Sequence, residues 1–230
     1  DFCLSRGLGD VYKRQLISSQ LEMLLMHKDM IPEVYNKILE IYKNSRRMNN
    51  LVDEVIDIRK QDQGYLKLKI SKENIVAVIE EICCSFYSYA QLNKIDLRFS
   101  STLKEADLYI DKTQIEKVFY NLLSNAFKYT PRNGYIKVML SQDDPDSTLH
   151  LLIRNSGKGL TEQQMAEVFD KYKIFDVAKF GNSVSNGIGL NLTKQLVELL
   201  GGEISVSSEL GKYVEFSVMI PSLSSDSLQV

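Results

Sequence analysis

Residues 121–130 read Asn-Leu-Leu-Ser-Asn-Ala-Phe-Lys-Tyr-Thr, a segment that predicts an amphipathic helix. At about 100° per residue, one face of this helix is apolar and carries Val118, Phe119, Leu122, Ala126 and Phe127. Asn121, Asn125 and Lys128 have the spacing i, i+4, i+7 and fall on a neighbouring arc. An amide oxygen one turn from a lysine suits Mg²⁺ on a nucleotide phosphate, because Mg²⁺ takes few protein oxygens and lysine acts as a point charge. An ordinary solvated polar face is the alternative, and the segment taken alone favours it.

A first glycine pair follows an apolar run, residues 149–153, that predicts a strand. The sequence after this run is Asn155-Ser-Gly157-Lys-Gly159-Leu. Two glycines one residue apart let the backbone turn sharply and approach a ligand closely.

A second glycine pair, Gly187 and Gly189, leads directly into a predicted helix over residues 191–200. Glycines at a helix start present free N–H groups and the positive end of the helix dipole to a phosphate. Either pair alone is weak evidence. The order is far more specific: polar helix, strand, glycine pair, helix, spacer, glycine pair, helix and a closing pair of strands.

With these motifs in this order, the chain resembles the ATP-binding domain of bacterial sensor histidine kinases, in the superfamily that includes gyrase B, Hsp90 and MutL. The matching segments are the N-box (121–130), the first glycine box (155–160), the F-box (169–172), the second glycine box (187–190) and residues 199–208 behind it. The resemblance covers about residues 16 to 221. It also suggests a hybrid kinase from a gut Bacteroides-like bacterium.

The resemblance implies an α+β fold, a two-layer α/β sandwich in which helices cover a mixed, mostly antiparallel sheet. It implies ATP and Mg²⁺ as cofactors, Asn125 as the metal ligand, and a lid over residues 173–186 that the nucleotide orders. For Tyr129, a place near the base or ribose and a role in the core are equally open. The implied nucleotide-binding residues are Asn121, Asn125, Lys128, Tyr129, Asn155, Gly157, Gly159, Lys173, Gly187, Ile188, Gly189 and Leu190.

The front of the chain predicts helices. Between residues 33 and about 61, residues of a heptad seam alternate by four and three, namely Val34, Ile38, Ile41, Ser45, Met48, Val52 and Val55. So wide a stripe needs partners on two sides, as in a four-helix bundle. By resemblance, residues 16–63 form a truncated dimerisation and phosphotransfer hairpin whose bundle is a homodimer. A monomeric hairpin packed on its own neighbouring domain is the alternative.

The remaining boundaries follow from pattern and resemblance. We expect a non-native leader over 1–15, the catalytic domain over 64–222 and a tail or linker over 223–230. Within the catalytic domain we predict strands over 65–70, 96–100, 107–111, 135–140, 150–154, 202–208 and 214–220. Residues 71–74 followed by the apolar run from Ile75 predict a capped helix through about Asn93.

The expected phosphoacceptor is missing. Relatives carry His-Glu-Leu-Arg-Thr-Pro, or a near variant, shortly before the segment that matches Leu16-Ile17. Residues 3–15 occupy that place without a histidine. His27 falls in the predicted hairpin turn and His150 in a predicted strand, so neither is a credible phosphoacceptor. We expect that this chain cannot phosphorylate itself on histidine.

The expected pocket departs from the family pattern at three places. Asn155 stands where an aspartate usually accepts a hydrogen bond from the adenine amino group, and an amide oxygen accepts more weakly than a carboxylate. Ser185 replaces a glycine that often begins the second box, and Tyr213-Val214 replaces a Gly-Thr pair.

Composition agrees with a folded protein: 44% of residues are hydrophobic, and the net charge of −2 indicates no nucleic-acid footprint. No apolar run approaches the roughly 18 residues that cross a bilayer. The three cysteines, Cys3, Cys83 and Cys84, favour reduced thiols and a cytoplasmic location. The resemblance implies an inner-membrane anchor only in other parts of a parent protein, and a response regulator receiver domain as partner.

Three functions compete. The first is the ATP-binding catalytic part of a histidine kinase, which transfers the γ-phosphoryl to a histidine on another helix. The second is an ATP hydrolase or clamp, but relatives of that kind carry a glutamate where this chain has Asn121, so the general base is missing. The third is a non-catalytic signalling or dimerisation module that binds nucleotide weakly, which Asn155 and the glycine lost at Ser185 keep open.

Overall fold

The computed structural model describes residues 68–142, 148–170, 173 and 189–221, together with residues 19–21, 23–24, 31, 33–35, 37–39, 41–42, 45, 48 and 52. The chain divides into two compact units, Asp1–Leu66 and Lys67–Val230. The expected leader, the turn at His27, the tail and most of the expected lid lie outside the described residues.

In the first unit, every described residue except Ile31 is helical, as predicted for this part of the chain. Several seam residues of the heptad pattern expose much of their side chains: Val34 by 45%, Ile41 by 54% and Met48 by 49%. Ser45, in the same seam, is buried. The apolar stripe read from the sequence is therefore largely open to solvent in the single chain.

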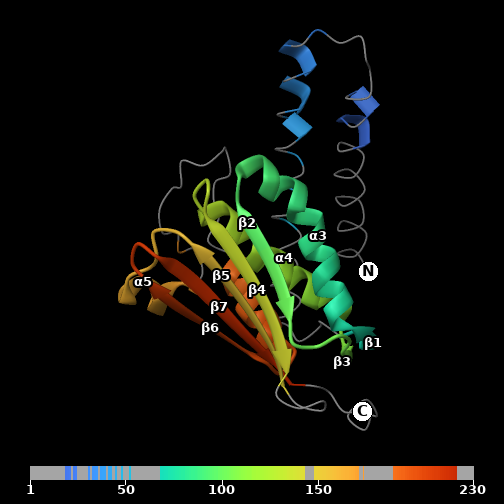
Figure 1. The fold of residues 1–230 in the computed structure, drawn as a ribbon. Coiled ribbons are helices and arrows are strands. Elements are labelled where there is room, and N and C mark those ends of the chain that lie inside the picture. Colours follow the sequence, from blue (N-terminus) through green and yellow to red (C-terminus); the bar gives the residue numbers. More distant parts are fainter. Residues whose placement is uncertain are drawn as a thin grey trace. The chain divides into compact units, whose positions relative to one another are not determined.

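The second unit is built on a five-stranded sheet (Figure 1) with the order β2-β4-β5-β7-β6. Its strands are β2 (Asp96–Ser101), β4 (Tyr135–Gln142), β5 (Leu149–Ser156), β6 (Glu203–Glu209) and β7 (Tyr213–Ile220). β2 and β4 run parallel, whereas the other three neighbouring pairs are antiparallel. The predicted mixed, mostly antiparallel sheet is confirmed. A separate antiparallel pair joins β1 (Ser71–Asn74) to β3 (Asp107–Ile110).

Three helices cover one face of this sheet, namely α3 (Ile75–Asn93), α4 (Lys112–Tyr129) and α6 (Gly189–Leu199) (Figure 1). Local capping fixes where they begin. The Asn74 side chain accepts from the backbone N–H groups of Val76 and Ala77 at the start of α3, and Asp111 accepts from Gln114 N at 3.1 Å at the start of α4. The short α5 (Glu162–Glu167) begins with a capping box at Thr161.

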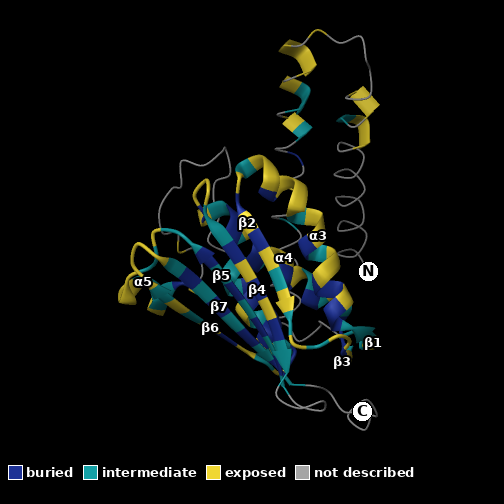
Figure 2. Cartoon of the chain, in the orientation of Figure 1, coloured by how far each residue is buried: buried dark blue, intermediate teal, exposed yellow. Residues whose placement is uncertain are grey.

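The core lies between the sheet and these helices. Alternate side chains of the central strands point into it, such as Ile136 and Val138 of β4 and Ile153 of β5, and each of the three is fully buried. Phe119 and Leu122 of α4 meet them from the helix layer and are also fully buried. Burial of each such side chain contributes about 1.5–3 kcal/mol, so this layer supplies much of the stability of the domain. Figure 2 shows the buried residues gathered between the layers.

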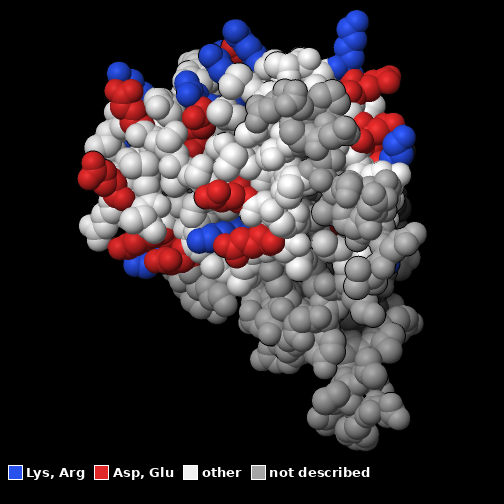
Figure 3. Space-filling view, turned by 90° about the horizontal axis from the view of Figure 1, so that it is seen from below, with Lys and Arg blue, Asp and Glu red and all other residues white. Residues whose placement is uncertain are grey.

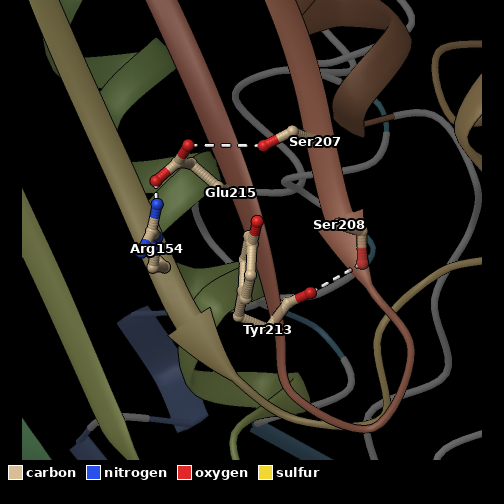
Figure 4. A network of polar contacts seen from close by, with 5 residues as sticks. All are labelled: Arg154, Ser207, Ser208, Tyr213 and Glu215. Carbon is tan, nitrogen blue, oxygen red and sulfur yellow. Dashed lines mark hydrogen bonds and ion pairs between the residues drawn. The ribbon is translucent and has the colours of Figure 1, made fainter.

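The opposite face of the sheet is polar and half-exposed. Arg154 of β5 lies opposite Glu215 of β7, to which its Nε donates a hydrogen bond at 2.5 Å (Figure 4). The guanidinium also lies 4.5 Å from the ring centroid of Tyr213, and Ser207 of β6 donates to the second oxygen of Glu215 at 3.3 Å. These cross-strand contacts fix the register of β5, β7 and β6 at this end of the sheet.

One predicted strand is wrong. We predicted a strand over residues 65–70, but Leu68, Lys69 and Ile70 are not in a strand, and β1 begins only at Ser71. The Lys69 backbone N–H instead donates to Oδ2 of Asp111 at 2.8 Å. Alternating side chains alone do not select a strand, because pairing needs a partner, and β3 pairs with residues 71–74.

Among the described helices, only α3 is long and apolar enough to cross a membrane by length and composition, which is weak evidence because α3 packs against α4 and β2. Among the described residues on the face shown in Figure 3, acidic and basic side chains are interspersed, so these residues form no large patch of a single charge.

Candidate nucleotide site

Helix α4 presents the predicted polar arc. Asn121, Asn125 and Lys128 are each partly exposed, whereas the residues between them, such as Leu122 and Ala126, are buried. The amphipathic pattern predicted from the sequence is therefore confirmed. Lys128 Nζ lies 5.1 Å from the ring centroid of Tyr129. Tyr129 is 38% exposed, which excludes a place in the core.

The first turn of α6 packs directly against this arc. Asn121 Nδ2 donates to Thr193 Oγ1 at 2.6 Å, and Thr193 Oγ1 donates to the Gly189 carbonyl at 2.9 Å. A Cβ atom on Gly189 would stand only 2.8 Å from Asn121 Oδ1. A side chain at 189 would therefore displace the Asn121 amide, and the start of α6 is held against that amide.

The first glycine box packs against two neighbouring segments. A Cβ on Gly157 would stand 2.8 Å from the Tyr129 carbonyl oxygen at the end of α4. Gly159 has a φ of +73°, and a Cβ there would stand 2.5 Å from the Glu209 carbonyl oxygen in the turn between β6 and β7. The Gly211 N–H of that turn donates to the Lys158 carbonyl at 2.7 Å. Both glycines thus permit a close approach between protein backbones, whereas the predicted approach to a ligand stays a prediction.

Asn155 ends the core-facing row of β5 and is only 3% exposed. It lies on the same face of the strand as Ile153, so its side chain points toward the helix layer. Its Nδ2 donates to the adjacent Ser156 carbonyl at 3.2 Å. That bond uses the amide nitrogen of Asn155. An adenine amino group is a donor and would need the other end of the amide, the oxygen, as its acceptor.

Further polar contacts involve Asn191 of α6 and Lys173. Asn191 Nδ2 donates to the Phe169 carbonyl at 2.8 Å, and Asn191 Oδ1 is buried without a hydrogen-bond partner among the described residues. Lys173 Nζ contacts Glu167 Oε2 at 2.7 Å, and this hydrogen bond raises the pKa of Lys173. In this arrangement the Lys173 ammonium is directed to a carboxylate of α5.

The predicted residues are therefore brought together in part. Asn121 and Gly189 are in contact, and so are Tyr129 and Gly157. Leu190 lies in the first turn of α6 and is partly exposed. Gly187 and Ile188 lie outside the described residues, as do the lid residues apart from Lys173.

Sequence reasoning missed Thr193 and Asn191, which link α6 to α4 and to the F-box. Thr193 is 1% exposed and sits on the buried face of α6 with Leu192, Leu196 and Val197. A threonine within an otherwise apolar helix face was the available signal, since a buried hydroxyl needs a hydrogen-bond partner.

The described residues contain no cluster of three or more His, Cys, Asp or Glu side chains that could hold a metal ion. A Mg²⁺ ion at this site would therefore take the partly exposed amide oxygen of Asn125 together with phosphate and water oxygens. That ligand set agrees with the preference of Mg²⁺ for substrate phosphates and few protein oxygens.

Comparison with curated proteins gives histidine kinases. The chain is 29% identical over 209 residues to histidine kinase P4 of Formosa agariphila. The aligned residues make up 90% of this chain and 15% of that protein. The chain is 26% identical over 189 residues to the sensor protein SrrB of Staphylococcus aureus, covering 82% of this chain and 32% of that protein. The chain thus spans less than a third of the length of both relatives.

Solved structures share the fold. Full-length ShkA in complex with AMPPNP has a TM-score of 0.76 and 18% identity, covering 95% of this chain and 46% of that one. The histidine kinase ThkA in complex with the response regulator protein TrrA has a TM-score of 0.63 and 22% identity. The match covers 97% of this chain and 62% of that one. The α+β sandwich expected from the sequence is confirmed.

The profile of the histidine kinase-, DNA gyrase B-, and HSP90-like ATPase family matches residues 110–224, a span that begins at the last residue of β3 and contains α4, both glycine boxes and the closing strands. The family predicted from the ordered motifs is thereby confirmed. The chain belongs to this ATPase family and carries the ATP-binding catalytic domain of a sensor histidine kinase.

Proposed function

We propose that this chain binds Mg-ATP between α4 and the start of α6 and directs the γ-phosphoryl group to a histidine on a helix supplied by another segment or polypeptide. The observation that carries the proposal is the contact between Asn121 and Gly189. It holds the N-terminal end of α6, where N–H groups attract phosphate, next to the helix that bears Asn125 and Lys128.

In the proposed complex, Asn125 ligates Mg²⁺, and Lys128 together with the first-turn amides of α6 near Gly189 contacts phosphate. Mg²⁺ would neutralise the charge of the β- and γ-phosphates. Asn155 Oδ1 accepts a hydrogen bond from the adenine amino group, and Gly157 and Gly159 allow the backbone to approach the base. The remaining residues of the set, Lys173 and 187–190, would border the phosphates and the lid.

The chemistry demands little of the protein beyond positioning. An imidazole nitrogen forms a bond to the γ-phosphorus, the bond to the β,γ-bridging oxygen breaks, and ADP leaves with the electron pair. The proton of the attacking imidazole passes to solvent. Catalysis is then orientation plus charge neutralisation, and the histidine need only be held in line with the γ-phosphate.

ATP hydrolysis is the weaker candidate. A hydrolase needs a base to activate water, and Asn121 occupies the place where the hydrolases of this superfamily carry a glutamate. Its amide nitrogen donates to Thr193, and a neutral amide does not accept a proton at neutral pH. A non-catalytic signalling module is favoured by the neutral Asn155 at the adenine position and by Ser185 in place of a glycine of the second box.

Partners and location follow from the same assignment. A response regulator is the partner, in line with the complex that ThkA forms with TrrA. The exposed Val34, Ile41 and Met48 would be covered by a second copy in a homodimeric bundle, through the stripe that the sequence predicted. The domain would act in the cytoplasm, and any inner-membrane anchor would belong to other parts of a parent protein.

Incubation with γ-labelled ATP tests the transfer step. The chain should acquire no acid-labile, base-stable label by itself, because neither His27 nor His150 has the sequence context of a phosphoacceptor. It should label an added phosphoacceptor hairpin taken from a relative such as SrrB. Label on this chain that disappears in His27→Gln would overturn the reading of its front end. Failure to label any such hairpin, despite nucleotide binding, would favour the non-catalytic module.

A further inference from the structure

We propose that Thr193 is a positioning residue of the nucleotide site: it fixes which way the amide of Asn121 points and couples α4 to the first turn of α6. This inference rests on the proposed function, because it assigns the oxygen of Asn121 to the Mg-ATP complex. Thr193 does not itself belong to the arc of α4 or to either glycine box.

The direction of the hydrogen bonds decides the orientation. A carbonyl oxygen can only accept, so the single proton of the Thr193 hydroxyl is committed to the Gly189 carbonyl, 2.9 Å away. The hydroxyl oxygen is then left as an acceptor. Asn121 must therefore offer its NH₂ group to Thr193, and it does so at 2.6 Å. The reversed amide would set two acceptor oxygens against each other.

The other end of the amide is thereby assigned. With the nitrogen bound to Thr193, Oδ1 is the end of the amide that remains to accept a hydrogen bond, and both ends border Gly189, where a Cβ atom would stand 2.8 Å from Oδ1 and 3.0 Å from Nδ2. This is the first residue of α6, the end of the helix that attracts phosphate. An amide oxygen repels a phosphate oxygen but accepts well from water. We therefore assign Asn121 Oδ1 to a water molecule in the coordination shell of Mg²⁺, one helical turn before Asn125.

The buried position of Thr193 shows why a hydroxyl matters there. Thr193 is 1% exposed, and its neighbours on the buried face of α6 are apolar. Valine has nearly the same shape and would satisfy packing alone. A valine would leave the NH₂ group of Asn121 without its acceptor and free the amide to rotate. Packing therefore does not account for a hydroxyl at this position, whereas control of the Asn121 amide does.

The test compares three single variants and one double variant of the full 230-residue chain. Binding of AMPPNP is measured by calorimetry with Mg²⁺ and with EDTA, and thermal unfolding without nucleotide confirms that each variant folds. Thr193→Val should weaken Mg-AMPPNP binding about fivefold and change AMPPNP binding in EDTA much less, because one hydrogen bond to the Mg-facing amide is lost. Thr193→Ser keeps the hydroxyl and should restore the wild-type affinity.

Asn121→Ala breaks the same link from the side of α4 and keeps the test decisive if Thr193→Val unfolds. It should reproduce the loss of Mg²⁺-dependent affinity. Adding Thr193→Val to Asn121→Ala should cause no further loss, because Thr193 acts only through Asn121. Equal Mg-AMPPNP affinity in the wild type and Thr193→Val, or an undiminished further loss in the double variant, would overturn the inference alone. A wild-type chain that binds no Mg-AMPPNP would overturn the proposed function and the inference with it.

Discussion

Asn121 of α4 and Gly189 of α6 are in such close contact that even a methyl group on Gly189 would displace the Asn121 amide. A Cβ atom on Gly189 would stand 2.8 Å from Oδ1 and 3.0 Å from Nδ2 of Asn121. The two residues belong to motifs that lie far apart in the sequence, and their contact brings the start of α6 to the polar arc of α4.

The first prediction concerns this contact. In Gly189→Ala, either α6 or the Asn121 amide must shift, which should lower the free energy of unfolding by about 1–3 kcal/mol and weaken Mg-AMPPNP binding. Urea unfolding and calorimetry measure the two effects. Gly201→Ala is the control for nucleotide binding: its φ of +74° strains an alanine, but among the described residues a Cβ there meets only Pro221 Cγ at 3.5 Å. If Gly189→Ala bound nucleotide as tightly as Gly201→Ala, the contact would have no part in the site.

The second prediction concerns Gly159. Its φ of +73° and the Glu209 carbonyl oxygen, 2.5 Å from a built Cβ, both oppose a side chain. Gly159→Ala should therefore lose about 2–4 kcal/mol in urea unfolding, from backbone strain plus overpacking. Gly201 has nearly the same φ of +74° in more open surroundings, so Gly201→Ala should lose only the strain of about 1–2 kcal/mol. Equal losses would show that the turn between β6 and β7 yields freely to a side chain at 159.

The third prediction concerns Asn155. A carboxylate accepts a hydrogen bond from the adenine amino group more strongly than an amide does, so Asn155→Asp should bind ATP several-fold more tightly. The same change should lower stability in the absence of nucleotide, because the site is only 3% exposed and a charge there loses its hydration. Asn155→Leu serves as the control and should weaken ATP binding. Calorimetry in which the aspartate variant bound no better than the leucine variant would remove residue 155 from the adenine site.

Local chemistry explains what was predictable from sequence. The period of α4 places Phe119 and Leu122 inside and leaves Asn125 partly exposed. The glycines of the first box do permit a close approach, although the partners that the structure shows are protein carbonyls. Asn74 and Asp111 cap helices as side chains of their kind do. Such features depend on neighbours in the chain, and a single sequence shows them.

The remaining features depend on contacts that no local pattern contains. β1 begins at Ser71 because β3 supplies a partner there, although residues 65–70 alternate better. The role of Thr193 depends on Asn121, 72 positions away in the sequence. The Arg154–Glu215 pair joins two strands that meet only in the sheet. Tertiary contacts of this kind override local propensity.

The fourth prediction concerns the adjacent cysteines of α3. Cys83 is fully buried, and burial raises the pKa of its thiol to about 12, whereas Cys84 is exposed. A raised pKa means less thiolate at pH 8, and the thiolate is the reactive form. Iodoacetamide should therefore label Cys84 and spare Cys83 in the native protein, and should label both in urea. Peptide mass spectrometry of the variants Cys84→Ser and Cys83→Ser shows which of the two adjacent cysteines carries the label. Fast native labelling of Cys83 would mean that α3 does not pack as described.

The most direct test of the nucleotide site is calorimetric titration of the chain with ATP, with Mg²⁺ and with EDTA, for the wild type and Asn125→Ala. The account predicts saturable binding at one site that is tighter with Mg²⁺ in the wild type, and no gain from Mg²⁺ once the Asn125 amide is removed. Absence of binding, or the same gain from Mg²⁺ in Asn125→Ala, would contradict it.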